Sequence, residues 1–356
     1  MKQLLKNIIQ LIILLTVTVQ LINAQDTLDL AKIETGVDKY LTYFSNENPG
    51  AVVSVMKKGE LIFNKAYGLS NVQSQEIMTN DKLFNLGELS KSFTALAILQ
   101  LAEKNKLSLD DNLKDIFPDF PEYGKKVTVN NILDHKSGLA AYNTETVLSN
   151  DEVFDFLINE KELQFEPGAK FEYSNSDYAL LAKIIESKSK MLYKDFLRKY
   201  IFKKIGMNNT WFSEEIEGKD IAPSHSKEKE VYVVKSDLNN IYGNQGVFTN
   251  SVDYARYDKA LYSSKLLKCE NLQKIFKIGK LTQKENKSDY DYGWVLMAKG
   301  GIRYFWQGGQ GGYTNLVLHL PDTQTTVLIL TNRDDGYDFL KMSIYIAKLF
   351  DKDLKL

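Results

Sequence analysis

The sequence predicts an α+β fold in which one sheet is built from strands at both ends of the chain. Alternating apolar residues mark two strands near the start, 50–57 and 61–67, and three near the end, 302–306, 315–320 and 325–331. From about residue 107 to residue 212, helical segments alternate with proline and glycine breaks. Strands that flank a helical middle predict a sheet with flanking helices and an inserted helical subdomain at about 107–212.

The first residues have the pattern of an export signal. Lys2 and Lys6 precede an apolar run over 8–22, and Ala24 offers a small residue for cleavage. We therefore expect 1–24 to be a signal peptide and 25–356 to be the mature domain, periplasmic or secreted. The run is shorter than the roughly 20 residues that cross a bilayer, so the mature form should have no membrane span. An uncleaved N-terminal anchor is the alternative.

Helices are predicted at three places around the strands. After Gln25, one amphipathic face should lie on the sheet; its apolar residues are Leu28, Leu30, Ile33, Val37, Tyr40, Leu41 and Phe44. Residues 90–104 hold too many apolar side chains for one narrow stripe, which predicts a central helix buried on most sides. A last amphipathic helix is predicted near 337–350. Gly59 suits the tight turn between the first two strands.

Charge and metal-binding residue types exclude several classes of function. The chain has 45 basic and 46 acidic residues, interspersed, which argues against a nucleic-acid partner. Cys269 is the single cysteine, so no intrachain disulfide can form. His135, His225 and His319 are far apart and lack metal-ligand spacing, so we expect no metal and no cofactor. The sequence does not predict an oligomeric state.

Five separated segments carry a shared pattern of motifs. They are LFNLGELSKSFTA at 83–95, ILDHKSGL at 132–139, FEYSN at 171–175, the glycine-rich segment 243–249 with Asp253, and WQGGQGGY at 306–313. In this order they resemble the class C β-lactamase, D-alanyl-D-alanine carboxypeptidase and esterase family, which also includes penicillin-binding proteins. The resemblance implies a β-lactamase/transpeptidase-like fold with an antiparallel sheet.

The resemblance also implies a catalytic arrangement. In the family, a serine opens a helix and a lysine one turn later takes its proton, while a tyrosine shuttles protons and an asparagine orients the substrate. Lys91, Tyr173 and Asn175 match the last three roles. In the last motif, Gly308 and Gly309 would line the substrate site. Backbone amides at the nucleophile position and at Gly309 would form the oxyanion hole.

Two positions depart from the family pattern. Glu88 stands at the nucleophilic serine, and Trp306 stands at the histidine or lysine of the last motif. A carboxylate is a weak nucleophile toward amides, and its charge opposes a developing oxyanion. We expect Glu88 to pair with Lys91 across one helical turn. Ser90, on another side of the helix, and Ser92, a turn deeper, are not placed to replace the serine.

Two functional hypotheses follow. In the first, the protein lacks acyl-serine hydrolase activity and keeps a cleft for a small molecule, a cell-wall peptide, a glycan or a protein partner. In the second, Glu88, Lys91 and Tyr173 perform acid/base chemistry in an esterase, peptidase or glycosidase of altered mechanism. A carboxylate pair of Glu88 with Glu172 or Asp177 would suit the glycosidase. Trp306 could stack a ligand or plug the cleft.

Overall fold

The computed structural model describes most of the chain after residue 30. The described residues are 31–42, 44, 47–143, 146, 149–228, 231–235, 241–268, 270–271, 287–299, 302–308, 313–334, 339–351 and 354. The predicted signal peptide and Cys269 lie outside them. Among the residues described, none of the helices is both long and apolar enough to cross a bilayer.

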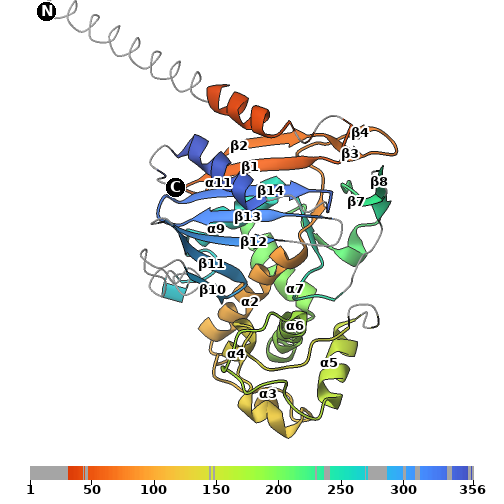
Figure 1. The fold of residues 1–356 in the computed structure, drawn as a ribbon. Coiled ribbons are helices and arrows are strands. Elements are labelled where there is room, and N and C mark those ends of the chain that lie inside the picture. The colour runs from red at the N-terminus through yellow and green to blue at the C-terminus, as the bar shows by residue number, and fades with distance from the viewer. Residues whose placement is uncertain are drawn as a thin grey trace, which may run out of the picture.

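A seven-stranded antiparallel sheet forms the upper part of the molecule (Figure 1). Its strands, in spatial order, are β10 (Lys287–Asp291), β11 (Trp294–Lys299), β12 (Ile302–Gly308), β13 (Leu316–Leu320), β14 (Thr325–Thr331), β1 (Ala51–Lys57) and β2 (Glu60–Tyr67). Strand β1 pairs with β2 on one side and with β14 on the other. The prediction that both chain ends build one sheet is therefore confirmed.

The β10–β11 hairpin was not predicted from the sequence. Strand β10 reads KSDYD and lies at the edge of the sheet. Charged and polar side chains on an edge strand discourage pairing with other molecules, and in β10 they replace the apolar alternation by which the other edge strand, β2, was predicted. The five predicted strands, in contrast, begin and end within two residues of the observed ones.

Alternate residues of β1 enter two different cores. Ala51, Val53 and Val55 pack in a cluster with the helix over 31–40 and with α11 (Phe339–Phe350), which cover one face of the sheet. Val52 and Met56 pack in the larger cluster on the opposite face, which includes residues of α9 (Ser251–Leu261) and α2 (Lys91–Glu103). The predicted amphipathic helices at both ends thus lie on the sheet.

Helix α2 is buried from Lys91 to Leu101, as predicted for the central helix. It packs against α6 (Asn175–Ser189). Helices α3 (Leu113–Ile116), α4 (Val129–Leu133) and α5 (Asn150–Asn159) lie in the lower part of Figure 1. The remaining helices of this region are η2 (Glu122–Lys126), α7 (Tyr193–Leu197), η3 (Arg198–Phe202) and α8 (Lys203–Ile205). Side chains cap several of them, with Thr128 and Asn131 forming a capping box at α4. The division into domains stays a prediction.

Three small sheets complete the described structure. The first pairs β3 (Leu69–Asn71) with β4 (Glu76–Ile77). In the second, β9 (Val247–Thr249) lies between β5 (Phe84–Asn85) and β6 (Trp211–Phe212), and the third pairs β7 (Ser224–Glu228) with β8 (Val231–Lys235). A short helix, η4 (Ser213–Glu215), follows β6. The β5–β9 pairing brings the glycine-rich segment beside the start of α2, where the amide of Leu86 donates to Val247 O across 2.9 Å.

Candidate active site

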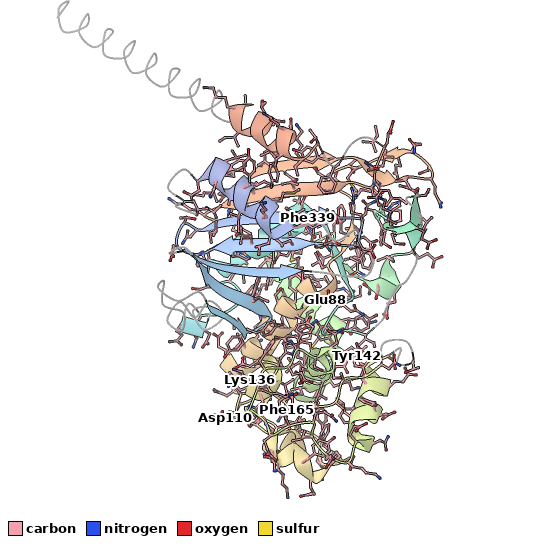
Figure 2. The ribbon with its side chains drawn as sticks, viewed as in Figure 1. Glu88, Asp110, Lys136, Tyr142, Phe165 and Phe339 are labelled. Carbon is pink, nitrogen blue, oxygen red and sulfur yellow. The ribbon has the colours of Figure 1, made fainter. Side chains whose placement is uncertain are left out.

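Glu88 lies in the short helix η1 (Gly87–Ser90), between β5 and α2. Gly87 has φ of 55°, a conformation that glycine adopts without strain, and its amide donates to Asn85 Oδ1 across 2.9 Å. This turn sets the direction in which the helix begins. The Glu88 side chain is half-buried, where the sheet meets the helices (Figure 2).

Lys91, the first residue of α2, is fully buried. Its ammonium donates to Asn175 Oδ1 across 2.9 Å and to the carbonyl oxygen of Asn244 across 3.3 Å. The same nitrogen lies 4.9 Å from the ring centroid of Tyr173 and 5.7 Å from that of Tyr178. The three residues that match the family's motifs, Lys91, Tyr173 and Asn175, are therefore brought together.

Burial and two carboxylates have opposite effects on the pKa of Lys91. Burial lowers the pKa of Lys91 to about 8, while the negative charges of Glu88 and Asp177 act to raise it. The expected attraction between Glu88 and Lys91 is thus present as an electrostatic effect. The hydrogen bonds described above, however, run from the ammonium to the two asparagines. The lysine is held in place by neutral acceptors.

Three tyrosines lie within electrostatic reach of Glu88. Burial raises the pKa of Tyr142 to about 12, and Glu88 contributes in the same direction. Burial, Tyr290 and Glu88 raise the pKa of Tyr173. Burial also raises the pKa of Tyr290, with a smaller contribution from Glu88. At neutral pH all three phenols are therefore protonated and able to donate hydrogen bonds.

His135 and Ser137 form a buried cluster with Asp177. His135 Nδ1 lies 2.9 Å from Asp177 Oδ2, and the Ser137 hydroxyl donates to Asp177 Oδ1 across 2.5 Å. Burial raises the pKa of Asp177 and lowers that of His135, while the hydrogen bond between them acts against both changes. The amide of Ser174 also lies 3.3 Å from His135 Nδ1. The cluster braces the segment that carries Tyr173 and Asn175, in keeping with the structural role expected for His135 and Ser137.

Ser90 and Ser92 are both buried, and their hydroxyls contact the backbone. Ser90 Oγ accepts from the amide of Val247 across 3.4 Å, and Ser92 Oγ donates to Leu89 O across 2.9 Å. Neither residue occupies the position of Glu88 at the head of the helix. The structure therefore supplies no substitute serine from this segment.

The two carboxylates considered as partners of Glu88 have other contacts. Asp177 is fully buried and bonded to His135 and Ser137. Glu172 is exposed, and its carboxylate lies 2.5 Å from the ammonium of Lys170. These arrangements do not favour a carboxylate pair for glycoside hydrolysis.

Trp306 and Gly308 lie on β12, where Trp306 pairs with Val295 and Leu318 and Gly308 pairs with Leu316. Strand β12 packs beside η1, the short helix that carries Glu88. The side chain of Trp306 and the whole of Gly309 lie outside the described residues, and so does the predicted oxyanion-hole amide of Gly309. Within the described ranges, no three metal-ligating side chains gather.

Three residues of the site were not predicted. Asn244 lies in the recognised glycine-rich segment, beside Gly243, so its position was marked although its role was not. Tyr142 and Tyr290 lie outside all five motifs, and no pattern in the sequence distinguishes them. They reach the site only through the folding of distant segments.

The fold and the site together define a protein of the serine β-lactamase and penicillin-binding-protein class. A family model described as beta-lactamase matches residues 31–349. A penicillin-binding protein of Bacillus subtilis (strain 168) is 30% identical over 308 residues, which are 79% of this chain and 67% of the relative. The chain therefore belongs to the beta-lactamase family, as its motifs implied.

Solved structures support the same fold. The octameric penicillin-binding protein homologue from Pyrococcus abyssi matches with a TM-score of 0.81 and 28% identity, over 90% of this chain and 77% of that one. D-amino acid amidase from Ochrobactrum anthropi SV3, complexed with L-phenylalanine amide, matches with a TM-score of 0.76 and 22% identity, over 90% of this chain and 99% of that one. The β-lactamase/transpeptidase-like fold is therefore confirmed.

Proposed function

We propose that this member of the beta-lactamase family lacks acyl-serine hydrolase activity and binds a peptide, a glycan or another small ligand without forming an acyl-enzyme. The observation that carries the proposal is the position of Glu88, at the head of the helix where the family has its nucleophilic serine. The nearest serines, Ser90 and Ser92, have hydroxyls that are buried against the backbone. The family's chemistry requires a hydroxyl beside the lysine.

Solvent access favours retained binding. Tyr173 is 46% exposed, while Glu88 and Asn175 are half-buried, so the side chains around Lys91 can meet a ligand. Lys91, Tyr173 and Asn175 keep their mutual contacts without a serine. A site that is accessible and preorganised but has no nucleophile suits recognition better than acyl transfer.

A fluorescent penicillin and chromogenic esters test this proposal. The unmodified protein should show no covalent labelling, whereas Glu88→Ser restores the hydroxyl beside Lys91 and should gain labelling. Glu172→Ser, a change of the same kind at the exposed surface, is the matched control and should stay unlabelled. An acyl adduct on a hydroxyl of the unmodified protein, detected by mass spectrometry, would contradict the proposal.

The second candidate is a hydrolase of altered mechanism that uses Glu88, Lys91 and Tyr173. The pKa of Lys91, lowered to about 8, favours it, because a general base works best when its pKa is near the working pH. Turnover of an ester, amide or glycoside, with a pH profile that changes near 8 and is abolished by Lys91→Met, would support this candidate.

We also infer that the protein is exported. The pattern of charged, apolar and small residues over 1–24 supports export to the periplasm or the exterior. Cell fractionation, together with N-terminal sequencing of the recovered protein, tests this. A mature form that begins near Gln25 is expected, and an intact N-terminus in the cytoplasm would contradict the inference.

A further inference from the structure

Two departures from the family's motifs change the charge of the site in the same direction. Glu88 brings a carboxylate to the position of a neutral hydroxyl, and Trp306 removes a histidine or lysine. The strand that carries Trp306 packs beside the short helix that carries Glu88. The site has therefore lost a group that would attract an anion and has gained one that attracts a cation.

Two exposed aromatic side chains pack with the buried ring of Tyr290. Phe171 is 49% exposed and Tyr173 is 46% exposed. The ring centroid of Tyr290 lies 5.7 Å from that of Phe171 and 6.1 Å from that of Tyr173. These three residues form an aromatic wall. Exposed aromatic rings attract cations at their faces and cover apolar groups, so the wall suits a ligand that has both.

A buried acceptor in the same site has no donor. Asn244 is 1% exposed, and its Oδ1 has no hydrogen-bond partner within the described part of the chain. Its backbone oxygen accepts from Lys91, and its Nδ2 donates to the hydroxyl of Tyr142 across 3.4 Å. Since an unpaired buried acceptor is costly, a ligand that donates hydrogen bonds would be favoured here.

The positive charge of Lys91 is the feature of the site that would repel a cationic ligand. Its ammonium is fully buried and is held by Asn175 Oδ1, by the carbonyl of Asn244 and by two ring faces. Asp177, also buried, contributes a compensating negative charge at Lys91. The side chain of Glu88, in contrast, is half-buried.

We propose that the site binds a primary ammonium group attached to an apolar arm, with Glu88 as the counter-ion and the aromatic wall covering the arm. An ammonium supplies three donors, which suit a carboxylate and an amide oxygen. The inference rests on the proposed function, because it takes the site to bind a ligand rather than to be acylated. It adds the chemical class of that ligand.

Isothermal titration calorimetry with three probes of one shape tests this inference: 2-phenylethylammonium, the neutral 2-phenylethanol and the anionic 3-phenylpropanoate. The ammonium should bind about tenfold more tightly than either of the other two, the size expected for one partly exposed ion pair with cation–π support. Glu88→Gln should remove this preference and leave the affinity for the alcohol unchanged. Tyr173→Leu should weaken both, and Tyr173→Phe should not.

Glu172→Gln is the matched control, because it removes an exposed carboxylate one residue from Tyr173 and should not change the preference. Circular dichroism melting of each variant identifies those that fail to fold. Equal affinity for the ammonium and the anion, no binding of any probe, or a preference that survives in folded Glu88→Gln would overturn this inference. Covalent labelling of the unmodified protein by penicillin would instead overturn the proposed function.

Discussion

The ammonium of Lys91 donates a hydrogen bond to the side-chain oxygen of Asn175 across 2.9 Å, although the two residues are 84 positions apart in the chain. The contact joins the first residue of α2 to the first residue of α6. The buried ammonium therefore ties the start of one helix to the start of the other.

The first prediction concerns the pKa of Lys91. Because Glu88 raises this pKa against the effect of burial, Glu88→Gln should lower it below its value of about 8 in the unmodified protein. NMR titration of protein with ¹³C-labelled lysine would follow the change. The carboxylate of Glu172 pairs with Lys170, so Glu172→Gln should leave the pKa of Lys91 unchanged. An unchanged pKa in Glu88→Gln would show that the two charges do not interact.

The second prediction concerns Asp258 and His319, which are buried on α9 and β13. The hydroxyl of Thr326 lies 2.7 Å from Asp258 Oδ1 and 2.8 Å from His319 Nδ1. Burial raises the pKa of Asp258 to about 7 and lowers that of His319 to about 3. Between about pH 4 and 6.5, folding therefore takes up a proton at Asp258 and releases one at His319, so their effects on stability oppose each other.

If one residue of this pair is replaced, the pH dependence of the free energy of unfolding should show the effect of the remaining one. In Asp258→Asn, the free energy of unfolding should fall as the pH falls from about 6.5 toward 3, by up to roughly 1.4 kcal/mol per pH unit. In His319→Gln, it should fall as the pH rises from about 4 to 7. Urea unfolding at a series of pH values measures both slopes. Slopes of the same sign in the two variants would refute the assignment.

The third prediction compares two glycines that both have positive φ. At Gly243, with φ of 97°, a Cβ would lie 2.0 Å from the carbonyl oxygen of Tyr178. At Gly218, with φ of 71°, a Cβ would meet nothing within 4 Å. Gly218→Ala should therefore cost only the backbone strain, about 1 kcal/mol. Gly243→Ala should cost at least about 3 kcal/mol, because the backbone of α6 must also move. Chemical denaturation measures both, and equal losses would contradict the steric account.

Local patterns in the sequence were sufficient for much of the fold. The strands β1, β2, β12, β13 and β14 show apolar alternation in their sequences, helix α11 shows amphipathic spacing, and α2 is a dense apolar run. A short stretch of sequence displays each of these patterns. The edge strand β10, which reads KSDYD, has no apolar alternation, and polar residues of this kind are tolerated at the edge of a sheet. It could be recognised only once its partner β11 was in place.

Some residues of the site could also be predicted from the sequence, and others could not. The motifs located Lys91, Tyr173 and Asn175, and the structure brings them together. No pattern in the sequence predicted that the site would include Tyr142, Tyr290 and the donor-free oxygen of Asn244. They come from loops and strands whose side chains meet only after the sheet and the helices have packed.

By itself, the sequence determined that an acid replaces a hydroxyl at the head of α2, because the identity of a side chain depends on nothing else in the molecule. Only the tertiary structure decided what surrounds that acid. The hydrogen bonds of the Lys91 ammonium depend on groups more than 80 residues away, and the pKa of Lys91 depends on burial as well as on the nearby Glu88 and the distant Asp177. Electrostatic energy depends on the distances between charges and on the exclusion of water. Only folding fixes these distances and removes the water.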